Sequence, residues 1–137
     1  MRQVLRVRDF MTTRLHVVSP DADIMDAASQ LVVLNISGLL VVEGDTLVGM
    51  LTERDLIDVA LKAGYHDESG GQVRDFMSSD VQTVEAEANL IDLAEIFATQ
   101  KYRRFPVMDK GRLAGLIARR DVLRALVSGA WFRSNAQ

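Results

Sequence analysis

Apolar residues recur at helical spacing in two stretches of this chain. In the first stretch, which follows Asp23, the apolar face holds Ile24, Ala27, Ala28, Leu31 and Val32. In the second stretch, which follows Asn89, it holds Leu90, Leu93, Ala94, Phe97 and Ala98. A spacing of three and four residues is typical of an amphipathic helix, and Asp and Asn are favourable N-caps. We therefore predict two helices whose apolar faces lie in the core.

Each of these helices is followed by two short apolar runs with a glycine-containing turn between them. The runs are GLLVV and LVGMLT around residues 43–45, and RFPVM and LAGLIA around residues 109–111. Such pairs predict β-hairpins. A short extended piece, LHVV or VQTV, precedes each helix, and a further helix is predicted from Glu53 and from Arg119. The predicted order of elements is β-α-β-β-α, and it occurs twice.

The two halves of the chain are copies of one unit. The motif VRDFM stands at residues 7–11 and again at 73–77, and a shift of 66 residues (73 minus 7) aligns the halves without a gap. We predict a mixed α/β (α+β) fold of two tandem units that pack through their sheets, because one unit cannot cover its own sheet. The expected boundaries are 7–63 for unit 1, 64–72 for the linker, 73–129 for unit 2 and 130–137 for a C-terminal tail.

Composition narrows the classes of protein to consider. Of the 137 residues, 48% are hydrophobic and 26% are charged, as expected for a soluble globular protein. The lack of cysteine excludes disulfides, thiolate metal sites and cysteine nucleophiles. The beginning of the chain does not read as a signal peptide, and the most apolar stretch, 31–42, is too short to span a bilayer. We expect a cytoplasmic protein that does not enter a membrane.

Basic residues are concentrated in one part of an acidic chain. The net charge is −3, yet residues 101–124 hold eight Lys and Arg side chains against Asp109 and Asp121. Two interpretations are open, namely a solvated face and a site for a small anion. A long nucleic acid is not the expected partner, because few aromatic residues are interleaved with the basic ones.

The junction between the last strand and the last helix of the first copy carries the richest local chemistry. It reads GMLTERD over residues 49–55. A helix N-terminus presents free N–H groups to a phosphate, the Thr52 hydroxyl adds a donor, and the Asp55 carboxylate can accept hydrogen bonds from ribose hydroxyls. The alternative is a capping box, in which Thr52 and Asp55 satisfy the helix end itself. The second copy keeps Asp121 but has Ala118 in place of the threonine, so a reciprocal box cannot form there.

The tandem units, each opening with a hydrophobic-Met motif and closing with Gly-h-h-Thr-x-x-Asp (h, hydrophobic), resemble a pair of CBS domains. The family is named after cystathionine β-synthase, and such a pair is often called a Bateman module. The resemblance covers Val7 to about Leu126. It implies a regulatory module that binds an adenosine nucleotide (AMP, ADP or ATP), or alternatively S-adenosylmethionine, in clefts between the two units, and that signals nucleotide state to a partner.

The resemblance also implies which residues form two composite clefts. In each cleft the Thr and Asp come from one unit, while the residues after the Met motif and before the second strand come from the other. The main cleft would hold Met50, Thr52, Asp55, Ser78, Val81, Gln82, Tyr102, Arg103 and Arg104. The second cleft would hold Thr12, His16, Ile36, Ser37, Gly38, Arg119 and Asp121.

The roles within the clefts follow from the same resemblance. Asp55 would hold the ribose, and Thr52 and the helix N-terminus would hold a phosphate. Arg103 and Arg104 occupy positions that face the phosphates in the γ subunit of AMP-activated kinase. The second cleft departs from the pattern, because it lacks the threonine and has no pair of arginines opposite Asp121. His16 either assists there or is an ordinary surface residue.

Other functions are weighed against this one. An enzyme is not expected, since the two histidines, His16 and His66, lack ligand spacing and no catalytic motif or metal site is recognised. A protein-interaction module with empty clefts stays open. Apolar positions on the final helices, such as Ile57 and Leu123, lead us to expect a homodimer. Trp131 in the tail is either an anchor for a partner or part of the chain's own core, and the sequence does not name the effector protein.

Overall fold

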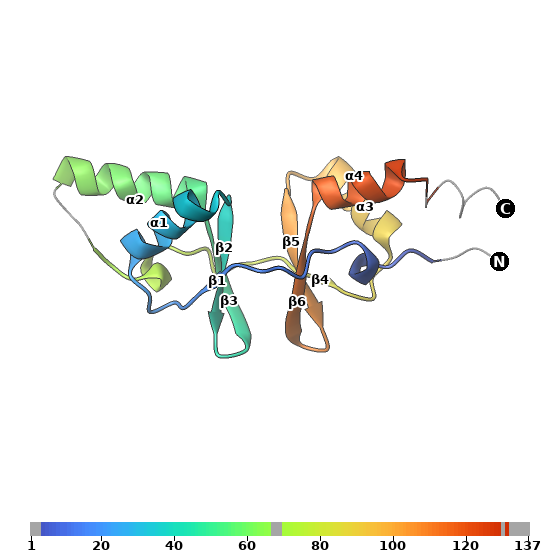
Figure 1. Cartoon of the computed structure of the whole chain (residues 1–137), viewed down its shortest axis with the longest axis horizontal. Coiled ribbons are helices and arrows are strands. Elements are labelled where there is room, and N and C mark those ends of the chain that lie inside the picture. Colours follow the sequence, from blue (N-terminus) through green and yellow to red (C-terminus); the bar gives the residue numbers. More distant parts are fainter. Residues whose placement is uncertain (1–3, 67–69, 130, 132–137) are drawn as a thin grey trace. The chain divides into compact units, whose positions relative to one another are not determined.

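The computed structural model describes residues 4–66, 70–129 and 131, and these residues form the same series of elements twice (Figure 1). The first copy forms β1 (Val17–Val18), α1 (Ile24–Leu34), β2 (Gly38–Glu43), β3 (Thr46–Thr52) and α2 (Glu53–His66). The second copy forms β4 (Val84–Glu85), α3 (Leu90–Thr99), β5 (Arg104–Asp109), β6 (Arg112–Ala118) and α4 (Arg119–Val127). Each VRDFM motif begins with a 3-10 turn, at Val7–Asp9 and Val73–Asp75. The predicted β-α-β-β-α order is confirmed.

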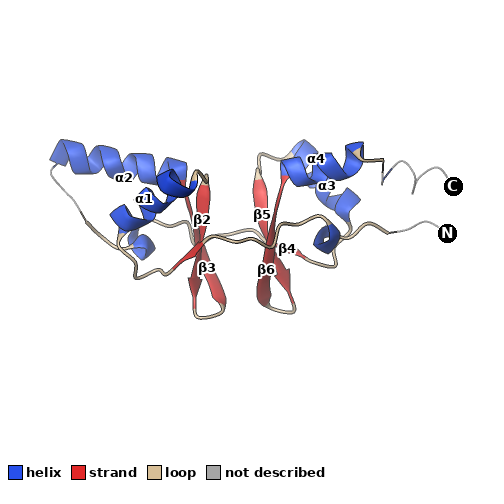
Figure 2. Cartoon of the chain, in the orientation of Figure 1, coloured by secondary structure: helices blue, strands red, loops and turns tan. Residues whose placement is uncertain are grey.

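Each copy builds a three-stranded mixed sheet with two helices beside it (Figure 2). In the first sheet β1 pairs parallel with β2, and β2 pairs antiparallel with β3. The sheet β4-β5-β6 has the same pairing. The hairpin turns place Gly44 and Gly111 at positive φ, as the glycine-containing turns predict. Each hairpin then leads its chain directly into a helix, so β3 ends at Thr52 where α2 begins.

The predicted helix caps are confirmed. The Asp23 carboxylate accepts hydrogen bonds from the N–H groups of Met25 and Asp26, both at 3.1 Å, and the Asn89 side chain accepts one from Ile91 at 2.8 Å. These bonds satisfy N–H groups that have no partner within the helix.

The predicted apolar faces of α1 and α3 are too wide. Ile24, Ala27 and Leu31 are buried, but the side chain of Val32 is 81% exposed. A position one residue on lies about 100° further round a helix, which carries Val32 beyond the narrow stripe that contacts the sheet. Ala98, one residue after Phe97, is exposed in the same way.

The compact units of the molecule do not coincide with the copies in the sequence. One unit comprises residues 16–81, called here the 16–81 unit. The other, called here the 82–137 unit, comprises the residues up to Leu15 together with those from Gln82 onward. The motif VRDFM does begin each copy in the sequence, but it folds onto the sheet and helices of the other copy.

The core of each unit shows this exchange. Val73 of the second motif is fully buried in the cluster that holds Ile24 and Leu51, and Val7 of the first motif is fully buried with Leu90 and Ile117. Backbone hydrogen bonds fix the motifs in place, for example from the Val73 N–H to the Ala22 carbonyl (2.9 Å). Each hydrophobic core is therefore complete only with a segment supplied by the other copy.

An arginine in each motif forms an ion pair with the unit that receives it. Arg74 pairs with Asp21 and lies 3.7 Å from Glu43, whereas Arg8 pairs with Glu87 and lies 3.2 Å from Asp109. The carboxylates raise the pKa of both guanidinium groups, chiefly through the side-chain hydrogen bonds to Glu87 and to Asp21. These pairs are exposed, so they fix the position of the motif more than they stabilise the fold.

Two further features concern the ends of the copies. Helix α2 continues to His66, so the polar segment expected as a linker begins with helical residues. Trp131 packs against the core cluster of the 82–137 unit, while its tail neighbours Ala130 and Phe132 lie outside the described residues. Among the described helices, none has the length and apolar character that a bilayer crossing requires.

Candidate functional site

The N-terminus of α2 is closed by a reciprocal capping box between Thr52 and Asp55. Asp55 Oδ2 accepts hydrogen bonds from the Thr52 N–H at 2.9 Å and from the Thr52 hydroxyl at 3.0 Å. The Asp55 N–H donates in return to Thr52 Oγ1 over a longer 3.4 Å. The capping interpretation of this sequence is therefore confirmed.

Capping uses only part of the Asp55 carboxylate. All its hydrogen bonds from described residues go to Oδ2, and Oδ1 accepts none from them. A carboxylate can accept several hydrogen bonds, and each oxygen has two lone pairs. Asp55 can therefore cap the helix through one oxygen and offer the other to the hydroxyl groups of a ligand.

The corresponding helix start in the 82–137 unit is built differently. Asp121 Oδ2 accepts a hydrogen bond from the Ala118 N–H at 2.8 Å, but Ala118 has no hydroxyl to return one. Asp121 Oδ1 lies 3.8 Å from an Arg124 guanidinium nitrogen. The position equivalent to Arg124 in the first copy is Asp58 (124 minus 66), which pairs with Lys62 at 3.1 Å instead. The second carboxylate therefore stands in a basic helix turn, and the first in an acidic one.

The opening motif of the second copy lies beside the start of α2. Ser78 and Met50 exchange two backbone hydrogen bonds, each 2.9 Å long, so the segment after the motif runs along the end of β3 that leads to Thr52. Thr12 and Leu116 make the equivalent pair in the 82–137 unit, also at 2.9 Å in both directions. Ser78 and Thr12, the residues that follow the two Met motifs, are thus each paired with a strand residue two positions before the strand ends. The helix with the capping carboxylate begins directly after that end.

Glycine makes this approach possible. A Cβ atom at Gly49 would lie 2.6 Å from Met77 Sδ and 2.9 Å from the Ser78 carbonyl oxygen. At Gly115, the equivalent distances are 2.6 Å to Met11 Sδ and 2.8 Å to the Thr12 oxygen. The glycine of the Gly-h-h-Thr-x-x-Asp motif therefore admits the neighbouring segment rather than a ligand.

The two arginines of the expected main cleft stand where the chain enters β5, Arg103 just before the strand and Arg104 as its first residue. The Tyr102 ring lies 4.8 Å from the Phe105 ring, and the Arg103 carbonyl accepts a hydrogen bond from the Arg119 N–H at 3.1 Å. These contacts hold the backbone of residues 102–104 against the start of α4. The Arg103 side chain is exposed and that of Arg104 is half-buried.

The segment before β2 is the equivalent in the 16–81 unit and has a different character. The Ser37 carbonyl accepts a hydrogen bond from the Glu53 N–H at 3.1 Å, and the His16 carbonyl accepts one from Leu40, also at 3.1 Å. Ile36, Ser37 and Gly38 are half-buried and carry no cation. This segment therefore has no positive charge to attract a phosphate, whereas residues 102–104 include two arginines.

The structure distributes the expected cleft residues over the two compact units. Of the main set, the 16–81 unit holds Met50, Thr52, Asp55, Ser78 and Val81, and the 82–137 unit holds Gln82, Tyr102, Arg103 and Arg104. Of the second set, the 16–81 unit holds His16, Ile36, Ser37 and Gly38, and the 82–137 unit holds Thr12, Arg119 and Asp121. Ser78 and Val81 belong to the second copy in the sequence, but they share the compact unit of Thr52 and Asp55. The exchange of the opening motifs is the physical reason.

A hollow of about 360 Å³ beside Asp55 adds residues that the motif did not indicate. Its lining comprises Asp55, Arg54, Asp58 and Phe76. Phe76 comes from the VRDFM motif of the second copy, and only the folded chain brings it next to α2. The hollow combines one aromatic side chain, one cation and two carboxylates, which suits a polar ligand with a flat ring.

Comparison with known proteins identifies the family. The model for the CBS domain matches residues 7–62 and residues 73–128, which together make up most of the chain. The chain belongs to the CBS domain family. Its fold agrees with this, since the two matched segments carry the same series of strands and helices.

Relatives and solved structures of CBS proteins cover nearly all of the chain. It is 34% identical over 117 residues to the CBS domain-containing protein YhcV of Bacillus subtilis, covering 85% of this chain and 81% of that protein. CBSX2 is a chloroplastic protein of Arabidopsis thaliana. Its crystal structure in complex with AMP is similar, with a TM-score of 0.76 and 35% identity, covering 90% of this chain and 96% of the crystallised chain. The CBS pair of MJ0100, solved with 5-methylthioadenosine and S-adenosyl-L-methionine, shares the fold at 23% identity and a TM-score of 0.72, covering 92% of this chain and 98% of that one.

Proposed function

We propose that this CBS pair is a regulatory module that binds an adenine nucleotide, AMP, ADP or ATP, and signals its presence to a partner protein without consuming it. The observation that carries the proposal is the divided role of Asp55, whose Oδ2 caps α2 while Oδ1 accepts no hydrogen bond from the described residues. The relative CBSX2, which binds AMP, supports the choice of ligand.

The proposed main cleft joins two sets of residues. Met50, Thr52, Asp55, Ser78 and Val81 supply the α2 side, and Gln82, Tyr102, Arg103 and Arg104 supply the other. Asp55 Oδ1 accepts hydrogen bonds from the ribose hydroxyls. The N-terminus of α2 and the arginines meet the phosphates, because guanidinium groups recognise phosphate in a bidentate manner. Apolar side chains such as Val81 contact the adenine.

The second cleft, with Thr12, His16, Ile36, Ser37, Gly38, Arg119 and Asp121, is the weaker site in this proposal. Asp121 Oδ1 already has Arg124 nearby, and the facing segment carries Ser37 and Gly38 in place of arginines. A ligand there would have to displace an existing charge pair and would find fewer cations for its phosphates.

Calorimetry on the parent chain and on Asp55→Asn tests the main site. Asparagine keeps one oxygen for the Thr52 cap but loses the negative charge and the second acceptor, so we expect AMP affinity to fall by at least tenfold while the fold persists. Asp26→Asn is the matched control, because it removes an exposed helix-start carboxylate that lies outside the proposed site. Equal AMP affinity of Asp55→Asn and the parent would restrict Asp55 to capping.

The same titration separates the candidate ligands and the candidate functions. We expect AMP, ADP or ATP to bind more tightly than S-adenosylmethionine, because only the nucleotides present phosphates to Arg103 and Arg104. Incubation with ATP should release no phosphate, as expected for a sensor without catalytic residues. A chain that binds none of these ligands, but retains a protein from its source, would instead be an interaction module with empty clefts.

The proposal includes a homodimer in the cytoplasm as the working form. Ile57 and Leu123 occupy equivalent positions on α2 and α4, and both side chains are more than half exposed. Apolar side chains of this size on exposed helix faces favour association with a second chain. Light scattering that gives the mass of one chain at all working concentrations would contradict the dimer.

A further inference from the structure

Methionine provides all the sulfur chemistry of this chain, because the sequence contains six methionines and no cysteine. Met11 and Met77 differ from the others, since each ends a VRDFM motif and the two positions are equivalent (77 minus 66 is 11). Oxidation converts the apolar thioether of methionine into a polar sulfoxide, and the reaction can be reversed enzymatically. The surroundings of these two sulfur atoms therefore decide what oxidation does to the fold.

Each of the two sulfur atoms packs against the glycine of a strand in the unit that receives its motif. Met77 Sδ occupies the space beside Gly49 of β3, where a Cβ atom would lie 2.6 Å from the sulfur and 3.0 Å from Met77 Cγ. Met11 Sδ takes the same place beside Gly115 of β6, with the same two distances. Both side chains are half-buried, so a small oxidant in solution can reach them although they are held in a defined place.

The backbone groups beside these contacts are already paired and offer no donor to a sulfoxide. The Ser78 carbonyl oxygen lies 2.9 Å from the Cβ position at Gly49, and it is an acceptor, as the sulfoxide oxygen is. The Met50 N–H and the Ser78 N–H donate to each other's carbonyl oxygens, both at 2.9 Å, and Thr12 and Leu116 do the same in the 82–137 unit. A polar group buried without a hydrogen bond is costly, so a sulfoxide is accommodated only when the side chain leaves the strand.

We propose that Met11 and Met77 are oxidation sites, and that a sulfoxide at either position releases the VRDFM motif from the unit in which it packs. A peroxide such as hydrogen peroxide supplies the oxygen. Its O–O bond breaks, one oxygen atom bonds to sulfur, and the other leaves as water with both hydrogen atoms. Sulfur thus loses two electrons and the peroxide gains two. The inference goes beyond the proposed nucleotide binding and does not depend on it, because it concerns the packing of the motifs alone.

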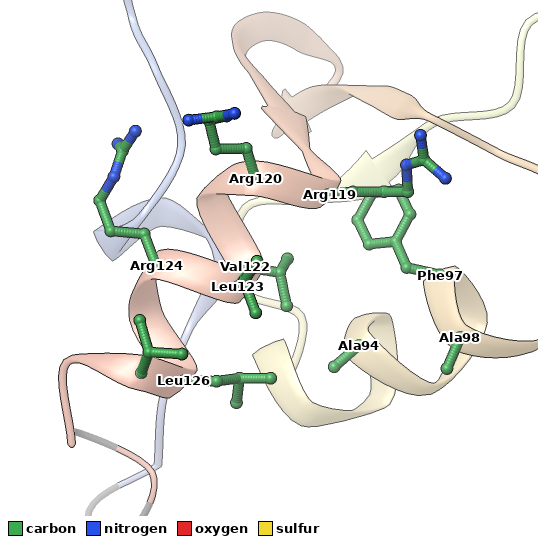
Figure 3. Close-up of a pocket in the computed structure, with 10 residues that line it drawn as sticks. Ala94, Phe97, Ala98, Arg119, Arg120, Val122, Leu123, Arg124 and Leu126 are labelled. Carbon is green, nitrogen blue, oxygen red and sulfur yellow. The ribbon is translucent and has the colours of Figure 1, made fainter.

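Release of a motif affects both a helix start and a hydrophobic core. Ser78, next to Met77, is paired with Met50 two residues before β3 ends at Thr52. Met11 packs against the core cluster of the 82–137 unit. Further members of this cluster line the hollow between α3 and α4 in Figure 3, namely Ala94 and Phe97 of α3 and Val122 and Leu126 of α4. Each oxidation should therefore loosen one unit and leave the other intact.

Urea unfolding before and after mild treatment with hydrogen peroxide tests the proposal, on the full chain and without nucleotide. Peptide mass spectrometry follows which methionines carry oxygen. We expect the oxidised parent chain to have an unfolding equilibrium constant at least tenfold larger than that of the untreated chain. The double variant Met11→Leu/Met77→Leu keeps apolar side chains of similar volume but lacks both sulfur atoms, so the same treatment should leave its stability unchanged.

Met25→Leu is the matched control, because Met25 lies on α1, outside both motifs, and is 41% exposed. This variant should lose as much stability on oxidation as the parent. Methionine sulfoxide reductases for both sulfoxide epimers should restore the parent, which distinguishes sulfoxides from irreversible damage. Oxidation of Met25 without oxidation of Met11 and Met77 overturns the proposal. So does a parent that carries both motif sulfoxides and keeps its stability, a double variant that loses stability as the parent does, or a loss that the reductases do not reverse.

Hydrogen exchange locates the effect in the single variants, each of which keeps one motif sulfur. Oxidised Met11→Leu retains Met77 as its motif sulfoxide, so we expect faster exchange in β3 and α1. Oxidised Met77→Leu should instead show faster exchange in β6 and α3. The reverse assignment, or an equal change in both units, overturns the release of individual motifs. These single variants also keep the proposal testable if the double variant does not fold.

Discussion

The hydroxyl of Thr52 and the carboxylate of Asp55 are joined by a 3.0 Å hydrogen bond that ends on a single carboxylate oxygen, Oδ2. The same oxygen also accepts a hydrogen bond from the Thr52 N–H, so capping uses Oδ2 and leaves Oδ1 for the ligand of the proposed function. The capping box and the nucleotide site are alternatives in the sequence, but the geometry of this carboxylate is compatible with both. A helix start can therefore be stabilised and still present an acceptor.

Removing the threonine hydroxyl should weaken α2 modestly. Thr52→Ala leaves the Thr52 N–H to Asp55 bond in place but removes the acceptor of the Asp55 N–H, as in the natural arrangement at Ala118. Loss of an N-cap costs about 0.5–2 kcal/mol, and the 3.4 Å distance places Thr52 near the low end of this range. Urea unfolding should show a free energy of unfolding lower by about 0.5–1 kcal/mol.

The reverse change at the start of α4 is the matched control. Ala118→Thr should raise the stability by a similar amount, because Asp121 is already placed to complete the box. If both substitutions shift stability in the same direction, the capping geometry does not account for the difference between the two helices.

The close approach at Gly49 should make that position intolerant of any side chain. Gly49→Ala places a Cβ atom 2.6 Å from Met77 Sδ and 2.9 Å from the Ser78 carbonyl oxygen. The sulfur can move, but the backbone oxygen belongs to the Met50–Ser78 pair. We expect a loss of about 1–3 kcal/mol in unfolding free energy, as for other overpacked positions, measured by urea unfolding.

Gly64→Ala is the control for this substitution, because it makes the same chemical change where, among the described residues outside its own helix backbone, no atom lies within 4 Å of the added carbon. Gly64 lies within α2, so alanine should stabilise the helix by about 0.5–1 kcal/mol. A Gly49→Ala variant as stable as the parent would show that the motif segment does not need this contact.

The sequence indicated the local elements and missed how they combine. Caps at Asp23 and Asn89 and hairpins around Gly44 and Gly111 depend on neighbours in the chain, so they could be predicted. The sequence could not predict which sheet each VRDFM motif packs against. Both sheets present similar apolar faces, because the copies are so alike, and nothing in five residues tells which sheet they will cover. Only long-range contacts, such as Val73 against Ile24, decide it.

The geometry around the candidate site was predictable to the same degree. The motif identified Thr52 and Asp55 because their spacing is local. The presence of Phe76 beside α2 and the place of Ser78 next to Met50 depend on the exchange of the opening motifs, which the pattern does not encode. The exposure of Val32 was missed for another reason, since helical spacing indicates a face but not how wide a stripe the sheet will cover.

Because each opening motif packs in the unit of the other copy, a cavity made in a motif should destabilise that unit. Val73→Ala removes two carbon atoms from a fully buried side chain, which should cost about 2–3 kcal/mol from lost burial and the cavity left behind. Hydrogen exchange should show faster exchange in α1 and β2 of the 16–81 unit, although residue 73 belongs to the second copy. Val7→Ala should instead loosen α3 and β5. Faster hydrogen exchange in α3 and β5 after Val73→Ala would contradict the packing of the second motif in the 16–81 unit.

The last prediction concerns the number of nucleotides bound per chain, which should be one at moderate concentration. The main site offers Asp55 Oδ1, the Thr52 hydroxyl and two arginines, whereas the second offers Asp121 beside Arg124, an alanine and no facing arginine pair. A hydrogen bond to a charged group is worth about 1.5–3 kcal/mol, and about 1.4 kcal/mol corresponds to a factor of ten in affinity. Loss of one such bond and two cations should weaken the second site by orders of magnitude, with Arg119 as the residue best placed to offset part of the loss.

Calorimetric titration with AMP should therefore saturate near one nucleotide per chain. Asp121→Asn should change the affinity far less than Asp55→Asn, and this pair is well matched because each aspartate accepts a backbone hydrogen bond from the residue three positions earlier. Ala118→Thr combined with Ser37→Arg should create a measurable second site, since it restores the hydroxyl and adds a cation to the segment before β2. Two equal sites in the parent chain would contradict the predicted asymmetry, and a larger effect of Asp121→Asn would place the stronger site at α4 rather than at α2.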